Sequence, residues 1–175
     1  MRYFKNLLLI FLLLPVTYTV SYYFIEIRPH AQDLKEKIDS YDSVSMNYQL
    51  IKKMAIEAEK KKGIINYVSH SLAVDYIDKN FRGGWHLIGA HWQLWIRIIY
   101  SEEELFNLWL AQAPYPRGRG MDEASLFFFN KKMEQLSCYQ LAQLTVMVRS
   151  PTMFKPESKK SEQRIKRYNL NSACN

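Results

Sequence analysis

Two arginines in a short loop are the residues whose type best suits binding of an anion. Arg117 and Arg119 lie in the run PYPRGRG at residues 114–120, where prolines and glycines predict a turn. A guanidinium can bind a diphosphate or a sugar carboxylate through two parallel hydrogen bonds. Ordinary loop solvation accounts for the same residues equally well, so both interpretations stay open.

The histidines and cysteines do not form the pattern of a metal site. His86 and His91 are five residues apart, whereas a helix brings two ligands onto one face at a spacing of three or four. Cys138 and Cys174 are the only cysteines, too few for a thiolate cluster. They can pair in an oxidising compartment, but Cys138 also suits an ordinary buried thiol, and the sequence leaves this choice open. We expect no metal and no cofactor.

Apolar residues recur at helical spacing along most of the chain and predict an all-α domain. Residues 47–62 have one apolar stripe opposite lysines and glutamates, and Gly63 is expected to end this helix. Further helices are predicted over 64–81 and 85–100. The second of these is apolar almost all round, so it should cross the core or lie against a membrane. We favour the core, because a cationic face is sparse.

Two later helices have a recognisable first turn. Ser101 with Glu104, and Ser137 with Gln140, have the spacing of a capping box, in which each side chain binds the backbone N–H of the other residue. Residues 102–104 are all glutamate, and the positive end of the helix dipole favours carboxylates there. We prefer that explanation to a catalytic one.

Three consecutive segments resemble the later motifs of the family 51 glycosyltransferases, the membrane-bound enzymes that polymerise peptidoglycan strands. Residues 100–110 (YSEEELFNLWL) are similar to the family's Y-S-K-x-x-I-L-x-x-Y-L, and residues 120–131 (GMDEASLFFFNK) to its G-x-x-x-A-A-x-x-Y-F-G-K. Residues 136–156 resemble its L-T-x-x-E-A-A-x-L-A and S-P-x-x-Y-x-P elements. Motifs in the right order are more specific than any one alone. The signature residues are Tyr100, Ser101, Gly120, Ala124, Phe128, Phe129, Lys131, Ser150 and Pro151.

This resemblance implies a lysozyme-like helical transglycosylase domain, truncated in its upper lobe, with a cleft that faces the membrane. Enzymes of this family need a carboxylate to take a proton from the acceptor hydroxyl, and charged groups to stabilise the departing lipid diphosphate. Counting back from Tyr100 at the family's spacing puts Gly89 where the second catalytic glutamate belongs. The nearest match to the first is Glu57. The G-G-S-T-I-x-x-Q signature is absent, and residues 68–72 resemble it only remotely.

Glu57 is therefore the one candidate for the catalytic base, although a solvated helical glutamate is the interpretation we favour. Arg117 and Arg119 are the candidates for substrate binding. If the chain retains the family's chemistry, these three side chains should converge on one cleft. If they point to separate faces, both the enzymatic and the glycan-binding interpretations weaken.

Residues 6–25 contain no charge and are long enough to cross a bilayer of about 30 Å. Arg2 and Lys5 precede this run, so the positive-inside rule predicts a cytoplasmic N-terminus and a domain outside the cytoplasmic membrane. A cleavable signal peptide is the alternative, but no small-residue cleavage pattern follows. We expect an anchor at 1–25, a juxtamembrane linker at 26–46, a helical domain at 47–170 and a tail at 171–175.

The net charge of +7, of which Arg2 and Lys5 contribute two, favours anionic partners such as membrane lipid or a lipid-linked precursor. Much of this charge lies at residues 155–167, where we favour a solvated helix face. Nucleic acid is not expected as a partner. The sequence thus predicts a transglycosylase-like protein of cell wall assembly with impaired or lost catalysis. The alternatives are a pseudoenzyme that binds lipid-linked precursor, glycan strand or other wall-synthesis proteins, and a structural membrane protein that packs on a partner helix.

Overall fold

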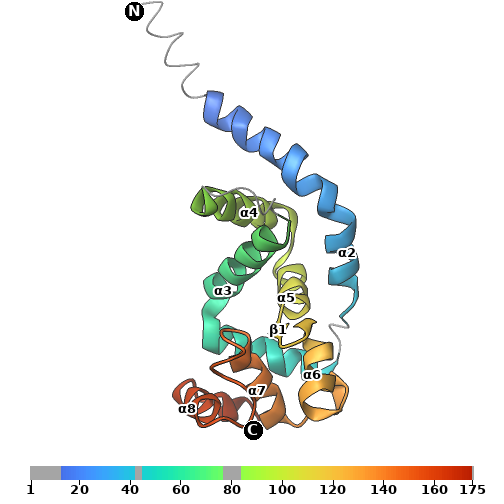
Figure 1. The fold of residues 1–175 in the computed structure, drawn as a ribbon, viewed down its shortest axis with the longest axis vertical. Helices are drawn as coiled ribbons and strands as arrows, with labels where there is room; N and C mark the ends of the chain where they lie inside the picture. Colours follow the sequence, from blue (N-terminus) through green and yellow to red (C-terminus); the bar gives the residue numbers. More distant parts are fainter. Residues whose placement is uncertain (1–12, 42–44, 77–83, 175) are drawn as a thin grey trace, which may run out of the picture.

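The computed structural model describes residues 13–41, 45–76 and 84–174, and these are almost entirely helical (Figure 1). The prediction of an all-α fold is confirmed. A helical segment at residues 13–22 leads into a π-helical turn, η1 (Tyr23–Ile27), and a 3-10 turn, η2 (Arg28–His30). The helices that follow are α2 (Ala31–Asp39), α3 (Met46–Tyr76), α4 (Trp85–Ile99), α5 (Glu102–Ala111), α6 (Met121–Phe129), α7 (Cys138–Met147) and α8 (Lys159–Arg167), with 3-10 turns η3 (Met133–Gln135) and η4 (Leu170–Cys174).

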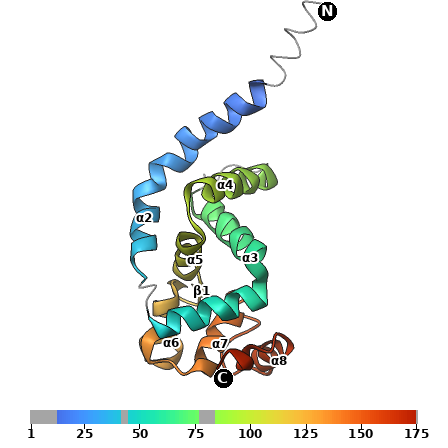
Figure 2. The ribbon, with the colours of Figure 1, turned by 180° about the vertical axis from the view of Figure 1, so that it is seen from behind.

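Helix α3 is the central element, and it is broken in the middle (Figures 1 and 2). Its first part lies against α7, and its second part runs on to α4. The break is at Lys60, whose φ of 60° and ψ of 161° are not helical. The prediction that Gly63 ends the helix is wrong, because Gly63 continues the second part. Its missing Cβ would lie 3.2 Å from Glu59 Cβ, so the turn is tightly packed there.

Residues 26–46, which we predicted as a linker, contain α2, and this helix packs along α5. Leu34 and Ile38 are buried against the domain. A hydrogen bond of Asn107 on α5 fixes this packing, because its Nδ2 donates to the carbonyl of Ile38 at 2.8 Å. Its Oδ1 accepts from the hydroxyl of Tyr48 on α3 at 2.6 Å. Helix α2 therefore belongs to the packed domain. The boundaries of the other predicted segments stay a prediction.

Both predicted capping boxes are confirmed. The Ser101 hydroxyl accepts from the backbone of Glu104, whose carboxylate accepts from the backbone of Ser101, and Ser137 with Gln140 has the same arrangement. The loop between α5 and α6 forms a two-residue hairpin, β1 (Pro114–Tyr115) with β2 (Gly118–Arg119). Gly120 follows with a φ of 117°, a conformation that side chains other than glycine rarely adopt.

Helix α4 differs from our prediction of a core helix. One face, with Ile88, Trp92 and Ile96, is buried against the domain. The opposite face leaves Leu87 64% and Ile98 63% exposed. The prediction was wrong because a helix that is apolar all round can be half covered, and the hydropathy of residues 85–100 does not distinguish the two arrangements.

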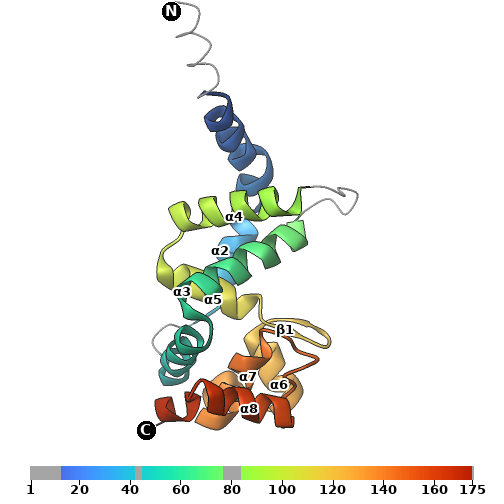
Figure 3. The same cartoon turned by 90° about the vertical axis from the view of Figure 1, so that its left-hand side faces the viewer.

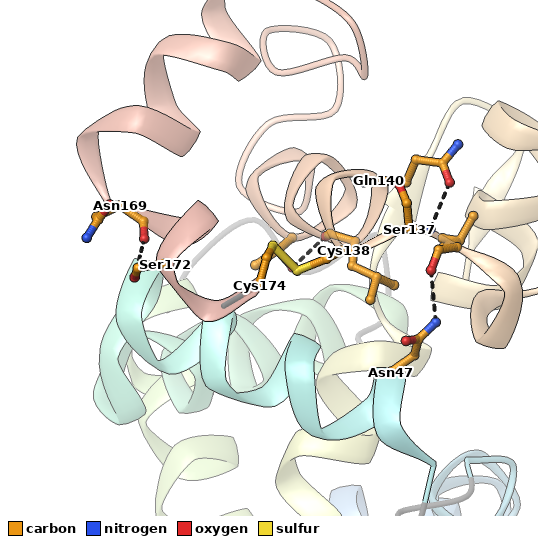
Figure 4. Close-up of a disulfide and its surroundings, with 10 residues drawn as sticks. Asn47, Ser137, Cys138, Gln140, Asn169, Ser172 and Cys174 are labelled. Carbon is orange, nitrogen blue, oxygen red and sulfur yellow. Dashed lines mark hydrogen bonds between the residues drawn. A yellow bond between two sulfur atoms is a disulfide. The ribbon is translucent and has the colours of Figure 1, made fainter.

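A disulfide joins the start of α7 to the C-terminal turn (Figure 4). Cys138 and Cys174 bond across a Cα–Cα distance of 5.7 Å, which settles the choice that the sequence left open. Next to it, Nδ2 of Asn47 at the start of α3 donates to the carbonyls of Met133 and Leu136. The chain's last turn, with Leu170 buried, is thereby held on the rest of the domain.

Among the described residues, no helix combines the length and the apolar character needed to cross a bilayer. The first part of the predicted span, residues 6–12, lies outside the described residues. The second part continues as the helical segment at 13–22, which projects from one end of the molecule, while α8 and the C-terminus lie at the other end (Figures 1 and 2).

Candidate functional site

A polar cleft opens where α2, the end of α3, the end of α5 and the start of α6 meet. It encloses about 380 Å³. Arg119, on the second strand of the hairpin, is one of its two basic side chains, and Lys37 is the other. Four carboxylates line the same cleft: Asp33, Glu36, Asp75 and Glu123. Carboxylates therefore outnumber cations in it.

Arg119 is held in this cleft by two groups of α3, which are linked in turn to Gln112 directly after α5. Its Nη2 lies 2.9 Å from Oδ1 of Asp75, and its Nη1 donates to the hydroxyl of Ser71. That hydroxyl donates in turn to Oε1 of Gln112 at 2.9 Å, and the carbonyl of Gln112 accepts from the Tyr67 hydroxyl at 2.9 Å. Ser71 and Gln112 are buried. A guanidinium fixed by a buried network of this kind keeps one orientation toward a ligand.

A second polar group lies on the α2 side of the cleft. The carboxylate of Asp33 accepts from Lys37 Nζ at 2.8 Å and from the Tyr76 hydroxyl. Hydrogen bonds from Lys37 and then Tyr76 hold the pKa of the Asp33 carboxyl below its ordinary value. The Tyr76 ring stacks on His30, with ring centroids 4.0 Å apart. Asp33 is therefore ionised at neutral pH and suited to accept hydrogen bonds from hydroxyl or amino groups.

The backbone at the cleft rim depends on Gly120 and Tyr41. The Tyr41 hydroxyl accepts from the backbone N–H of Met121 at 3.2 Å, and burial, with Asp122 nearby, raises the pKa of this phenol. Asp122 itself lies in the first turn of α6, where burial, Glu134 and Glu123 raise the pKa of its carboxyl to about 6. A carboxyl with such a pKa titrates close to neutrality, but it does not line the cleft.

The structure does not bring the three predicted site residues together. Arg119 lines the cleft, whereas Arg117 is exposed on the hairpin turn, with its guanidinium 5.3 Å from the ring centroid of Phe127. Glu57 lines a different hollow, on the first part of α3, beside Lys52 and Lys53. The catalytic role of Glu57 and the binding role of Arg117 stay predictions, without the convergence that would support them.

Gly89, which the resemblance places at the family's second glutamate, lies on α4, and no described residue lies within 4 Å of the place where its Cβ would be. Packing of the described residues therefore leaves room for a Cβ at this point. Among the described residues, no group of three or more histidine, cysteine or acidic side chains is arranged to hold a metal ion.

Two of the signature residues, Ala124 and Lys131, take part in the packing of α6 and of the turn that follows it. Ala124 is fully buried, and Asn130 ends α6 in the left-handed conformation, with a φ of 53°. The carbonyl of Lys131 accepts from the Ser125 hydroxyl at 2.7 Å. By contrast, Ser71, Asp75 and Gln112 were not predicted as site residues, because they carry no local motif. They lie on α3 and directly after α5, and only the folded arrangement of these helices brings them near Arg119.

Comparison with known proteins gives two findings. Residues 89–172 match the family model described as Transglycosylase. Over 172 residues, the chain is also 27% identical to YfeL, an uncharacterised protein of Salmonella typhimurium strain LT2, and this similarity covers 95% of the chain and 90% of that protein. No solved structure matches the chain significantly. The lysozyme-like and truncated shape that the resemblance implies therefore stays a prediction.

Proposed function

We propose that the chain, of which residues 89–172 match the transglycosylase family model, binds the sugar and peptide portion of peptidoglycan or of its lipid-linked precursor without polymerising it. The observation that carries the proposal is the polar cleft around Arg119. Its fixed guanidinium and its ionised Asp33 provide donors and acceptors for sugar hydroxyls and peptide groups, while Glu57 lies in a different hollow.

The charge of the cleft favours the sugar and peptide portion over the diphosphate. Arg119 is already paired with Asp75, and three further carboxylates line the cleft. Like charges repel, so a diphosphate binds weakly there unless a basic side chain first leaves its carboxylate partner. Hydroxyl and amino groups, in contrast, bind well to carboxylates and to an oriented guanidinium.

Two observations support the proposed absence of polymerisation: residue 89 is a glycine, and Glu57 lies outside the cleft. Glycosyl transfer of this type needs a base within hydrogen-bond reach of the acceptor hydroxyl. Gly89 offers no carboxylate, and Glu57 does not line the cleft that holds Arg119. The protein is then a pseudoenzyme that binds peptidoglycan or its lipid-linked precursor.

We further propose that residues 6–25 anchor the chain in the cytoplasmic membrane, with the N-terminus in the cytoplasm and the domain outside. The uncharged run and its preceding Arg2 and Lys5 support this topology. The disulfide between Cys138 and Cys174 supports it independently, because disulfides persist outside the reducing cytoplasm.

The test is to measure binding and polymer formation together, with the purified full chain in detergent. One sample contains the lipid-linked disaccharide-peptide, and another contains a soluble disaccharide-peptide that lacks the lipid diphosphate. We expect binding of both and no glycan polymer. Binding that requires the diphosphate would contradict the proposed ligand portion, and polymer that disappears in Glu57→Gln would contradict the loss of catalysis.

Arg119→Lys and Arg117→Lys form a matched pair for this assay, because both lie on the hairpin and only Arg119 lines the cleft. Lysine keeps the charge but lacks the two-pronged donor geometry. Hydrogen bonds to charged groups contribute roughly 1.5–3 kcal/mol, so Arg119→Lys should weaken binding by about tenfold or more. Arg117→Lys should leave binding unchanged. Equal losses of affinity in both variants would show that the cleft does not bind the ligand.

A further inference from the structure

Helix α4 has two apolar faces, and the described residues cover only one of them. Ile88, Trp92 and Ile96 are buried, while Leu87, Leu94 and Ile98 are 64%, 44% and 63% exposed. The spacing of seven and four residues puts the exposed three in one stripe along the helix. An uncovered stripe of large aliphatic side chains is costly in water and marks a surface that contacts something else.

The stripe is continuous with the apolar surface of the N-terminal helical segment. Trp95 of α4 donates its indole N–H to the carbonyl of Thr19 at 3.1 Å, and its ring lies 4.7 Å from that of Tyr23. Leu94 and Trp95 form one groove with Val16 and Val20 of that segment. The exposed aliphatic side chains therefore extend from α4 directly onto the helical segment at residues 13–22, which is part of the uncharged run at residues 6–25.

The orientation of α4 suits a helix that lies flat on a surface. It runs across the end of the domain from which the N-terminal segment departs, and α8 lies at the opposite end (Figures 1 and 3). If that segment continues into a bilayer, α4 lies beside the point of entry, with its exposed stripe next to the membrane.

The charges of α4 also fit lipid headgroups. Its sequence, WHLIGAHWQLWIRII, contains no aspartate or glutamate. Arg97 and His86 are exposed, and helical geometry places both on the same flank of the apolar stripe. A cation beside an apolar stripe is the arrangement by which interfacial helices bind phosphate groups and acyl chains at once.

We propose that α4 lies in the interface of the lipid bilayer, with Leu87, Leu94 and Ile98 among the acyl chains and Arg97 among the headgroup phosphates. This inference rests on the membrane anchor proposed above. The domain is then held at the membrane by two contacts, the crossing helix and α4, and it cannot rotate freely about its anchor. A second copy of the chain could cover the same stripe, but that would not explain its continuity with the uncharged run.

The experiment uses the full chain in vesicles of phosphatidylethanolamine and phosphatidylglycerol, with one nitroxide label per protein. Labels are placed at Leu94→Cys on α4, at Leu14→Cys on the N-terminal segment and at Lys166→Cys on α8. The two native cysteines are bonded to each other, so each label reacts only with the introduced thiol. Collision rates with oxygen, which concentrates in lipid, and with a water-soluble nickel chelate then report the surroundings of each label.

We expect the labels at positions 94 and 14 to collide more with oxygen than with nickel, and the label at 166 to show the reverse. The label at 94 should lie at about 5–10 Å depth, shallower than a membrane-crossing helix. A label at 94 that behaves like the one at 166 overturns the inference while leaving the anchor intact. Low collision with both reagents at 94 means that a protein surface covers the stripe, which also overturns it. A label at 14 in water removes anchor and inference together.

Discussion

At the scale of single residues, Glu59 and Glu57 differ sharply although they are close neighbours on α3. Glu59 is largely buried and binds two arginines, with its carboxylate oxygens 3.0 Å from Nη1 of Arg149 and 3.2 Å from Nη2 of Arg164. Arg164 also lies 4.5 Å from the ring centroid of Phe154. This cluster joins the break in α3 to the end of α7 and to α8. Glu57 forms no ion pair within the described part of the chain.

Glu59→Gln should therefore destabilise the protein, whereas Glu57→Gln should not. Removing one partner of a buried ion pair lowers the free energy of unfolding by roughly 3–5 kcal/mol. Because Arg149 is partly exposed, we expect a loss at the lower end of this range, about 3 kcal/mol. Glu57→Gln should stay within about 0.5 kcal/mol of the parent. Thermal unfolding of both variants in detergent measures the difference. Equal stability of the two would mean that the cluster contributes nothing.

Asp122 gives the protein a specific pH dependence. Its carboxyl has an ordinary pKa of 3.8 and a folded-state pKa of about 6, so the folded state binds the proton more tightly than the unfolded state. The free energy of unfolding must then fall as pH rises from about 4 to 6. Asp122→Asn removes this term. At pH 7 the variant should be more stable than the parent, and the difference should shrink as the pH is lowered toward 4. Parallel pH profiles from urea unfolding would contradict the shifted pKa.

At the scale of elements, the two helical glycines provide another matched pair. Gly89→Ala should stabilise the protein by roughly 0.5–1 kcal/mol, because alanine is favoured in helices and nothing lies within 4 Å of its Cβ. Gly63→Ala should gain less, since its Cβ would lie 3.2 Å from that of Glu59. Melting temperatures of the two variants test this. A loss of stability in Gly89→Ala would show that something occupies the space beside α4.

At this scale, the features that the sequence predicted correctly were local ones. The helix starts at Ser101 and Ser137 follow from motifs only four residues long, in which side chain and backbone satisfy each other. The break at Lys60 was not predictable, because lysine has no preference for a positive φ. The neighbouring Glu59 binds Arg149, just after α7, and Arg164 on α8, and no local pattern reports these contacts. The cleft was missed for a related reason: Ser71 and Asp75 lie on α3 and Arg119 lies far later in the sequence, and no periodic pattern predicts contacts between such distant segments.

At the scale of the whole molecule, the disulfide contributes stability, and its redox state in cells tests the proposed location of the domain. It closes a loop with a sequence separation of 36, for which the loss of chain entropy in the unfolded state corresponds to roughly 3–4 kcal/mol. Replacing Cys138 and Cys174 together by serine should lower the free energy of unfolding by about that amount. A reducing agent should have the same effect on the parent and none on the variant, which is the control.

The proposed topology predicts that this disulfide is formed in living cells. After cells are lysed in acid to stop exchange, a maleimide reagent should leave both cysteines unmodified unless a reductant is added first. If the domain were in the cytoplasm, both thiols would react at once. The result decides on which side of the membrane the domain lies, independently of any ligand.

The open space beside Gly89 has an evolutionary consequence. Some glycine codons become glutamate codons by a single base change, and no described residue lies within 4 Å of the place where a Cβ at position 89 would be. Packing around that Cβ position therefore does not oppose a side chain there. A lineage could therefore acquire an acid at position 89 in one mutational step, without a clash at the Cβ position of α4.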